Sequence, residues 1–227
     1  MLGRALLFLV LICGGCPALA QIAPSPAEIA AYRGLHAAAA SGNTAEIEKL
    51  VKAGNPIDAR DGHQRTPVHV AAHLKRNEAA ALLMKLGADA NALDAQKYDI
   101  VTIAAVADDV PMLKVALAGG CRSGNMTSPY DGTALIAAAH LGHDEVVRIL
   151  IAAKAPLDHV NNLHWTATIE SIVLGNGGKR HIATLEALVK AGANLKLADS
   201  SGATPLTLAK RRGYAEMVAI LEKAGAK

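Results

Sequence analysis

The chain has 227 residues, of which 52% are hydrophobic, 3% are aromatic and 19% are charged, and its formal net charge is +3. This charge is too small for non-specific binding to nucleic acid, so we expect no nucleic-acid partner. The length suits one ordinary domain or one repeat array. Because the apolar residues are mostly alanine, leucine, isoleucine and valine, the composition favours a core of closely packed short helices.

The first 20 residues have the pattern of a secretory signal peptide. Arg4 supplies a positive charge, residues 5–12 form an apolar run, and residues 18–20 read Ala-Leu-Ala, which has the small-x-small form of a signal peptidase site. We therefore expect cleavage after Ala20 and a periplasmic or secreted protein. The apolar run is too short to anchor the mature chain in a bilayer, so no integral membrane segment is expected.

Cleavage would remove two of the three cysteines and leave Cys121. The mature chain could then form no intrachain disulfide and would be held by packing alone. We interpret Cys121 as an inert small side chain in a turn, with a free thiol or an intermolecular link as the alternatives. A lipoprotein is the alternative to soluble export, but Cys13 occupies the position before Cys16 where a lipoprotein signal requires an aliphatic residue.

A repeated phrase runs along the chain after residues 21–30, which contain two prolines and are interpreted as a short linker. The phrase reads "TPVHVAA" from Thr66 and "TPLTLAK" from Thr204. Its copies start at residues 33, 66, 99, 133, 166 and 204, at intervals of 33, 33, 34, 33 and 38 residues. Segments with apolar residues at helical spacing keep phase with these copies, and most of them end in Gly-Ala, which stops a helix. The period predicts a tandem array of helix pairs.

These phrases resemble the ankyrin repeat. The Thr-Pro phrase, the "GHDE" turn at residues 142–145 and the "GADAN" ending at residues 87–91 match parts of its pattern. The resemblance covers about residues 31–227 and implies an all-α solenoid of six helix-turn-helix repeats with hairpin-like loops. It places the repeats at about residues 31–61, 62–94, 95–128, 129–161, 162–199 and 200–227. It also extends to exported bacterial ankyrin repeat proteins, whose penultimate repeat has a longer loop between its helices.

The residues of the repeated phrase support this fold physically. Pro67 and Pro205 stand in the first turn of a helix, where a missing N–H costs nothing, and Thr66 and Thr204 precede them as N-caps. Pairs of alanines in the first helix of several repeats let neighbouring helices approach closely. Because one helix pair is too small to bury its own apolar face, the repeats must stack.

No pattern in the sequence indicates an enzyme. The chain has no Gly-x-Ser-x-Gly phrase, and Cys121 has no histidine nearby in sequence to act as a base. His69 and His73 stand four residues apart, which could suit a metal, but no third ligand is evident nearby in sequence. The resemblance instead assigns His69 to a bridge with the backbone of a neighbouring repeat. We expect no cofactor. The alternative, motivated by His73 and His140, is an accessory protein that binds a metal, haem or a small molecule in oxidative-stress defence.

The stretch "LGNGGKRH" at residues 174–181 has the composition of a phosphate-binding loop. However, its glycine spacing is not that of a P-loop, and Arg180 stands where serine or threonine is needed. Gly175 is in phase with Gly142 and Gly213, which end the first helix of other repeats. We therefore interpret the stretch as a five-residue insertion that lengthens the turn between two helices, with an anion at the next helix N-terminus as the alternative.

The candidate binding surface is the row of hairpin tips together with the exposed positions of the first helices. The resemblance implies this surface, because ankyrin proteins typically bind partners there. Trp165 is the only tryptophan, and Tyr98 and Tyr130 are two of the four tyrosines, so these scarce aromatics suit interface anchors. The alternative is that they pack against neighbouring hairpins. We predict a monomer that binds a partner protein without catalysis. The candidate partner-binding residues are His63, Arg65, His73, Tyr98, Tyr130, His140, Asn162, Trp165, Arg211 and Arg212.

Overall fold

The structure is a computed structural model that describes residues 21–227. The expected signal peptide, with its cleavage site and two of the cysteines, lies outside the described residues. Within residues 21–227 the chain forms helices joined by turns and hairpin-like loops, together with one isolated antiparallel bridge between Thr127 and Gly132.

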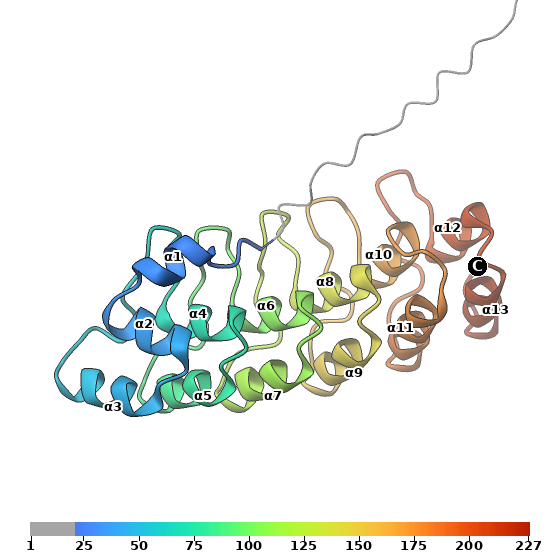
Figure 1. Cartoon of the computed structure of the whole chain (residues 1–227). Helices are drawn as coiled ribbons and strands as arrows, with labels where there is room; N and C mark the ends of the chain where they lie inside the picture. Colours follow the sequence, from blue (N-terminus) through green and yellow to red (C-terminus); the bar gives the residue numbers. More distant parts are fainter. Residues whose placement is uncertain (1–20) are drawn as a thin grey trace, which may run out of the picture.

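Two layers of helices run along the array (Figure 1). Each repeat contributes one helix to each layer, and we call these the first helices and the second helices. The first helices are α2 (Gly34–Ser41), α4 (Pro67–His73), α6 (Ile100–Val106), α8 (Ala134–Leu141), α10 (Ala167–Val173) and α12 (Pro205–Arg212). The second helices are α3 (Thr44–Lys52), α5 (Asn77–Lys85), α7 (Val110–Ala118), α9 (Asp144–Ala152), α11 (Lys179–Lys190) and α13 (Ala215–Lys223). These helix pairs confirm the expected all-α solenoid, and a short helix, α1 (Pro26–Ala31), precedes them.

The first helices α6, α8, α10 and α12 each begin at a residue whose side chain caps the helix, whereas Arg33 before α2 makes no such bond. The Asp99 carboxylate accepts a hydrogen bond from Thr102 N at 2.8 Å, and Thr166 Oγ1 accepts one from Ile169 N at 3.2 Å. Pro67 opens α4, where its missing N–H leaves no helical bond unmade. Such caps satisfy N–H groups that the first turn of a helix leaves without a partner. The starts of these helices are therefore determined locally.

Buried histidines of the first helices join neighbouring repeats. His69 Nε2 lies 3.1 Å from the Tyr98 carbonyl oxygen, and His36 Nε2 lies 3.0 Å from the Arg65 carbonyl oxygen. His69 is fully buried, and this burial lowers the pKa of its imidazole. Its Nδ1 accepts from Thr66 N at 3.2 Å, so the neutral ring donates from Nε2. His69 thus bridges the backbone of two repeats, as the resemblance implied.

The buried apolar core is divided at α10. One cluster, which we call the main cluster, runs through the first four repeats and reaches Ala167 in α10 and Leu188 in α11. A second one, the C-terminal cluster, contains Ile169 and Ile172 of α10 and continues through α11, α12 and α13. The same helix α10 buries three polar residues, Thr168, Glu170 and Ser171. The last two repeats therefore have a core that is partly separate from that of the first four.

The segment expected as a linker, residues 21–30, is folded onto the array instead. Ser25 and Glu28 form a capping box that starts α1, with Ser25 N donating to Glu28 Oε2 at 2.8 Å and Glu28 N donating to Ser25 Oγ at 3.2 Å. Helix α1 lies beside the hairpin loops of the N-terminal repeats (Figure 1). The Ile22 N–H donates to Gln96 Oε1 at 3.1 Å, which ties the segment to a hairpin 74 residues further along the chain.

Arg65 holds this segment in place. Its side chain is 1% exposed, and its Nε donates to Asp61 Oδ2 at 2.7 Å. One of its terminal nitrogens donates to the Ile22 carbonyl oxygen at 3.1 Å, and the other pairs with Glu28. The prediction that Arg65 binds a partner is therefore wrong. A residue at a hairpin tip is exposed only when no other segment of the chain covers the hairpin, and here the N-terminal segment covers it.

Acid is expected to loosen the N-terminal segment. Hydrogen bonds from Ser25 lower the pKa of Glu28 to about 2. Burial raises the pKa of Asp61, but hydrogen bonds from Tyr32 and Arg65 outweigh it and lower the value to about 2. Both carboxyls have a pKa of about 4 in the unfolded chain. Their contribution to stability is therefore fully present above about pH 5 and is lost as the pH falls towards about 2.

Urea unfolding at a series of pH values tests this expectation. The midpoint of the wild-type protein should fall as the pH drops through this window. Glu28→Gln should be less stable at neutral pH and should show a smaller fall, because it lacks one of the two carboxyls. Equal pH dependence of the two proteins would show that ionisation of the Glu28 carboxyl has no net effect on folding.

Candidate partner-binding surface

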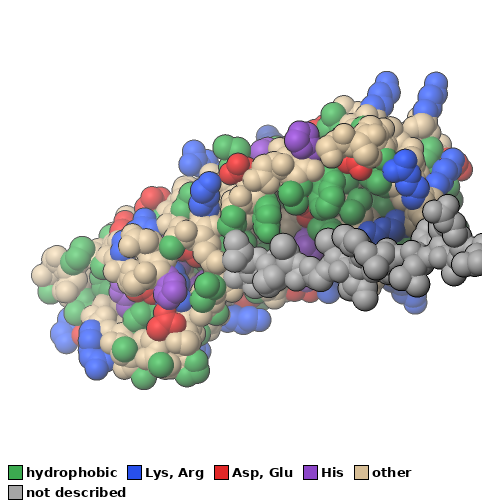
Figure 2. Space-filling view, turned by 90° about the horizontal axis from the view of Figure 1, so that it is seen from above, with side chains coloured by type: hydrophobic (Ala, Val, Ile, Leu, Met, Phe, Trp, Pro, Cys, Tyr) green, Lys and Arg blue, Asp and Glu red, His purple; other side chains and the backbone are tan. Residues whose placement is uncertain are grey.

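Side chains at the C-terminal ends of the first helices form a row along the array, which we call the groove row. It consists of His73, Leu74, Val106, His140, Leu141, Val173, Leu174, Arg211 and Arg212. The row runs along the ends of α4, α6, α8, α10 and α12, and we infer that it borders the hollow between the first helices and the hairpin loops. Leu141 and Leu174 are 40% and 41% exposed, unlike the buried leucines of the core. Figure 2 shows hydrophobic side chains gathered in this hollow and Lys and Arg side chains around its C-terminal end.

The hairpin tips add further accessible residues. His63 and Asn162 are exposed, and Tyr130 is half-buried. Asn162 also joins two hairpins, because its backbone N–H donates to the Tyr130 carbonyl oxygen at 3.0 Å and its side-chain amide donates to the Pro129 carbonyl oxygen at 3.2 Å. His63, Tyr130 and Asn162 thus lie where a partner can reach them, and their role in binding stays a prediction.

Two aromatic residues predicted at the tips turn towards the protein interior. Tyr98 is 7% exposed and belongs to the main cluster, so the prediction that it binds a partner is wrong. Trp165 is half-buried and packs against the C-terminal cluster. The physical reason is that successive hairpins stack, as in the hydrogen bond from Ser128 N to the Lys97 carbonyl oxygen at 3.0 Å. A large side chain between two stacked hairpins is covered by them.

The two histidines of the groove row have different surroundings. Burial, together with the nearby His69 and Arg65, lowers the pKa of His73 to about 4, so this half-buried ring is neutral at physiological pH. His140 is more accessible, with 36% of its side chain exposed, and its Nδ1 lies 3.5 Å from Glu170 Oε2. The ring of His140 therefore lies next to a carboxylate while part of it stays accessible.

Glu170 is a buried carboxylate that the sequence did not single out. It is 5% exposed, and its Oε1 accepts a hydrogen bond from Asn161 Nδ2 at 2.7 Å while Oε2 lies near His140. A buried charge is tolerated only with such partners. The equivalent positions of other repeats hold Ala37, Val70, Ile103, Ala137 and Leu208. One carboxylate among apolar residues at the same repeat position is the signal that could have revealed it.

The described residues form no evident metal or membrane site. Within residues 21–227, no group of three or more His, Cys, Asp or Glu side chains could hold a metal ion. In the same part of the chain, no helix is long and apolar enough to cross a membrane. His73 and His140 belong to the second and fourth repeats, so the two rings lie at separate positions along the groove row.

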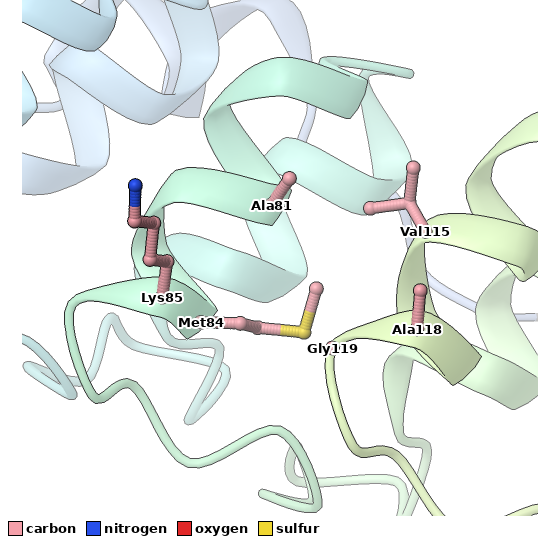
Figure 3. Close-up of a pocket in the computed structure, with 6 residues that line it drawn as sticks. All are labelled: Ala81, Met84, Lys85, Val115, Ala118 and Gly119. Atoms are coloured by element: carbon pink, nitrogen blue, oxygen red, sulfur yellow. The ribbon is translucent and has the colours of Figure 1, made fainter.

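A cavity of about 360 Å³ lies between α5 and α7, among the second helices (Figure 3). Its lining is formed by Ala81, Met84, Lys85, Val115, Ala118 and Gly119. The Met84 side chain extends towards Gly119, where an added Cβ would lie 2.4 Å from the sulfur. Apart from Lys85 the lining side chains are apolar, so the cavity lacks the converging polar groups that orient a small ligand.

The insertion at residues 174–181 joins repeats. In the first turn of α11, Arg180 donates to Asp108 at 2.8 Å and to Asp144 at 3.1 Å, which belong to the third and fourth repeats. His181 Nε2 lies 2.9 Å from the His140 carbonyl oxygen at the end of α8. Helix α11 has 12 residues, whereas the other second helices have 9 each. The extra turn carries the side chains that reach back along the array.

Close contacts explain the glycines of this insertion. A Cβ at Gly175 would lie 2.0 Å from the Ser171 carbonyl oxygen and 2.7 Å from the His181 ring. Gly177 has a φ of +67°, and a Cβ there would lie 2.7 Å from the Tyr214 ring. Tyr214 in turn donates from its hydroxyl to the Gly175 carbonyl oxygen at 2.9 Å. The interpretation of this stretch as a lengthened turn between helices agrees with the structure.

Cys121 is expected to be unreactive in the folded protein. It is 7% exposed, its Sγ donates to the Ala90 carbonyl oxygen at 3.0 Å, and burial raises its pKa to about 12. Because the thiolate is the reactive form, iodoacetamide should leave Cys121 unmodified in the native protein and should modify it in concentrated urea. Mass spectrometry measures the added group. Rapid modification without urea would show that the thiol is accessible.

Comparisons with known proteins agree with this architecture. A family model of ankyrin repeats, with three copies of the repeat, matches residues 9–94 and 101–199. The ankyrin repeat protein YahD of Escherichia coli (strain K12) is 30% identical over 190 residues, which are 83% of this chain and 94% of that protein. An ankyrin repeat domain from Acinetobacter baumannii AYE, known from a crystal structure, is 42% identical with a TM-score of 0.79 over 85% of this chain and 98% of that chain. The ankyrin repeat domain of Bcl-3 is 25% identical with a TM-score of 0.77 over 86% of this chain and 87% of that chain.

These likenesses cover nearly the whole described array, including the stacked helix pairs and the hairpins between them. Ankyrin repeats are generally protein–protein interaction modules, and the fold is typically non-catalytic. The family model spans more than half of the sequence, and the similarity to YahD spans most of both chains. On this evidence the chain belongs to the ankyrin repeat family.

Proposed function

We propose that this protein binds a partner protein through the C-terminal half of its groove, at α8, α10, α12 and the hairpins beside them. One observation carries the proposal: Leu141 and Leu174 are 40% and 41% exposed at the ends of adjacent first helices, and Val173, the residue before Leu174, is half-buried. In the neighbouring hairpin Val160 and Leu163 are 43% and 40% exposed. Large apolar side chains that are exposed together on one face mark interaction sites.

The N-terminal half of the groove is less suited to a partner. The segment that contains α1 is bonded to the hairpins of Arg65 and Gln96 and covers part of them. Tyr98, at the equivalent position of the next hairpin, is also buried. The exposed apolar side chains of the groove row therefore lie in the part of the array that this segment leaves open.

A pull-down with matched variants tests this proposal. The groove variant carries Leu141→Glu and Leu174→Glu. The control carries Ala152→Glu and Ala219→Glu, which place the same added charge at exposed positions of α9 and α13 among the second helices. Wild type and control should retain the same cross-linked partner from a periplasmic extract, and the groove variant should lose it. Equal retention by all three proteins would show that the partner binds elsewhere.

We further propose that the protein acts as a monomer after export, in the periplasm or outside the cell. The support is the signal-peptide pattern of residues 1–20. Fractionation of the producing cells followed by N-terminal sequencing should find the chain in the exported fraction, starting at Gln21. A cytoplasmic chain that still starts at Met1 would contradict export.

A further inference from the structure

Charge is distributed unevenly along the groove row. From α4 to the end of α10 the row holds histidine, leucine, valine and no lysine, arginine, aspartate or glutamate. At α12 it ends in Arg211 and Arg212, both exposed. The carboxylate beneath the row, Glu170, is buried and bonded to Asn161. The hollow is therefore apolar in its middle and basic at its C-terminal end, as Figure 2 shows.

The two arginines at this end are exposed to an acidic ligand, although Arg211 already lies near one carboxyl: hydrogen bonds from Ser201 and Ala203, and to a lesser extent the charge of Arg211, lower the pKa of Asp199. Neither Arg211 nor Arg212 forms an ion pair with a carboxylate within residues 21–227, whereas the adjacent Lys210 pairs with Glu222 at 2.7 Å. Arg212 donates one hydrogen bond to the Val173 carbonyl oxygen, which holds its guanidinium beside the groove row. A guanidinium has five N–H donors, so most of those of Arg212 remain for a ligand. Carboxylates are the side chains that match this planar fork.

The stacking of repeats sets the spacing of these features. Packed helices lie about 8–10 Å apart, so Leu141, Leu174 and the arginines of α12 follow one another in steps of about 10 Å. An α-helix advances about 10.5 Å in seven residues. A strand advances about 10 Å in three residues. A partner segment that follows the groove row therefore places a side chain against each repeat about every seven residues if it is a helix, or about every three residues if it is a strand.

We infer that the partner segment held by this groove is apolar on its contacting side and carries carboxylates at the end that lies over α12. The inference rests on the proposed function and adds the chemistry and the direction of the partner. The exposed leucines of α8 and α10 bury the apolar side chains, and Arg211 and Arg212 bind the carboxylates. The segment thus has two apolar anchors about 10 Å apart, followed by Asp or Glu after one more step of the same length.

Selection from a random peptide library displayed on yeast tests this inference on the purified protein. The enriched peptides should contain two apolar residues that are about three or about seven positions apart. Asp or Glu should then occur near only one of the two apolar residues, towards one end of the peptide. A fluorescent synthetic copy of an enriched peptide then serves as the probe in anisotropy titrations. Leu141→Glu with Leu174→Glu should abolish binding. Arg211→Glu with Arg212→Glu should weaken it at least about tenfold, and added salt should weaken wild-type binding.

A matched control and a charge exchange separate recognition from misfolding. Lys190→Glu with Lys223→Glu makes the same change of charge on the second helices of the last two repeats, α11 and α13, and its affinity should stay within about twofold of wild type. Because Arg212 contacts Val173, Arg211→Glu alone is also measured, and it should lose part of the affinity at an unchanged melting temperature. A peptide with its acidic residues changed to lysine should bind the double arginine variant better than it binds wild type.

The outcomes distinguish this inference from the function on which it rests. Enriched peptides that need Leu141 and Leu174 but lack acidic residues, or that ignore Arg211 and Arg212, would overturn the inference and leave groove binding intact. Peptides that bind independently of the two leucines, or a library that yields no binder, would count against the proposed function itself.

Discussion

Replacement of Arg65 by methionine is expected to lower the free energy of unfolding by about 3 kcal/mol and to release the N-terminal segment. The side chain of Arg65 is 1% exposed and that of Asp61 is 9% exposed, so methionine would leave a nearly buried carboxylate without its cation. Glu28 is 31% exposed and is partly hydrated by solvent, so its loss of the ion pair contributes less. The Ile22 carbonyl oxygen would lose the hydrogen bond from Arg65, which is one of the bonds that hold the N-terminal segment on the array.

Two measurements check this result. Urea unfolding followed by circular dichroism gives the change in free energy, and trypsin cleavage at Arg33, just after α1, reports release of the segment. Arg60→Met is the matched control, because Arg60 is exposed and bonds to the carbonyl oxygens of Gln64 and Leu93, and we expect it to cost less than about 1 kcal/mol. If Arg65→Met is as stable as wild type and Arg33 stays protected, the buried ion pairs contribute no net stability.

Replacement of Ile172 by alanine is expected to cost about 3 kcal/mol, with the loss concentrated in the last two repeats. Ile172 is fully buried in the C-terminal cluster, and alanine would leave a cavity there. In a repeat array most contacts join neighbouring repeats, so the stability is approximately a sum of local terms; here the bond from Arg180 to Asp108 is an exception, because it spans from the fifth repeat to the third. The apolar core is also divided at α10, which limits how far the effect of the cavity spreads.

Hydrogen exchange measured by mass spectrometry locates this effect. Amides of α10 to α13 should lose protection in Ile172→Ala, while those of α4 to α7 should keep it. Leu83→Ala is the control, because Leu83 is equally buried but lies in α5 within the main cluster, and we expect its loss of protection in the N-terminal repeats. Uniform loss of protection in both variants would show that the six repeats unfold as one unit.

The helices and their order could be predicted from the sequence because their signals are local. Asp99 and Thr166 each satisfy an N–H group within their own first turn, and Pro67 needs no partner for its nitrogen. The period of the phrase then indicates how many helix pairs must stack. The insertion could be located in the same way, since it is the one place where the interval rises to 38 residues.

The candidate surface could be predicted only in part. The ends of the first helices were expected to be accessible, and Arg211, Arg212 and part of His140 are. Arg65 and Tyr98 were expected at exposed tips and are buried. Ile22 and Glu28, which bond to Arg65, lie in the segment around α1, and Tyr98 is packed into the main cluster. The repeated phrase does not indicate either contact, because both depend on which other segment of the chain packs on the hairpin tip.

The bonds of Arg180 show the same limit. Its sequence context, glycines followed by basic residues, is shared by anion-binding loops and by simple long turns. Only the folded array brings Asp108 and Asp144 to its guanidinium, from positions 72 and 36 residues away.

The sequence by itself determined the fold, since each repeat carries its own caps, its helix stops and the small side chains that stacking requires. The tertiary structure alone decided which hairpin tips stay open, where the apolar core divides and which charges form ion pairs within residues 21–227. The physical reason is that a helix start is satisfied within one turn of chain. Exposure and charge pairing, in contrast, depend on neighbours that stacking brings from 30 or more residues away.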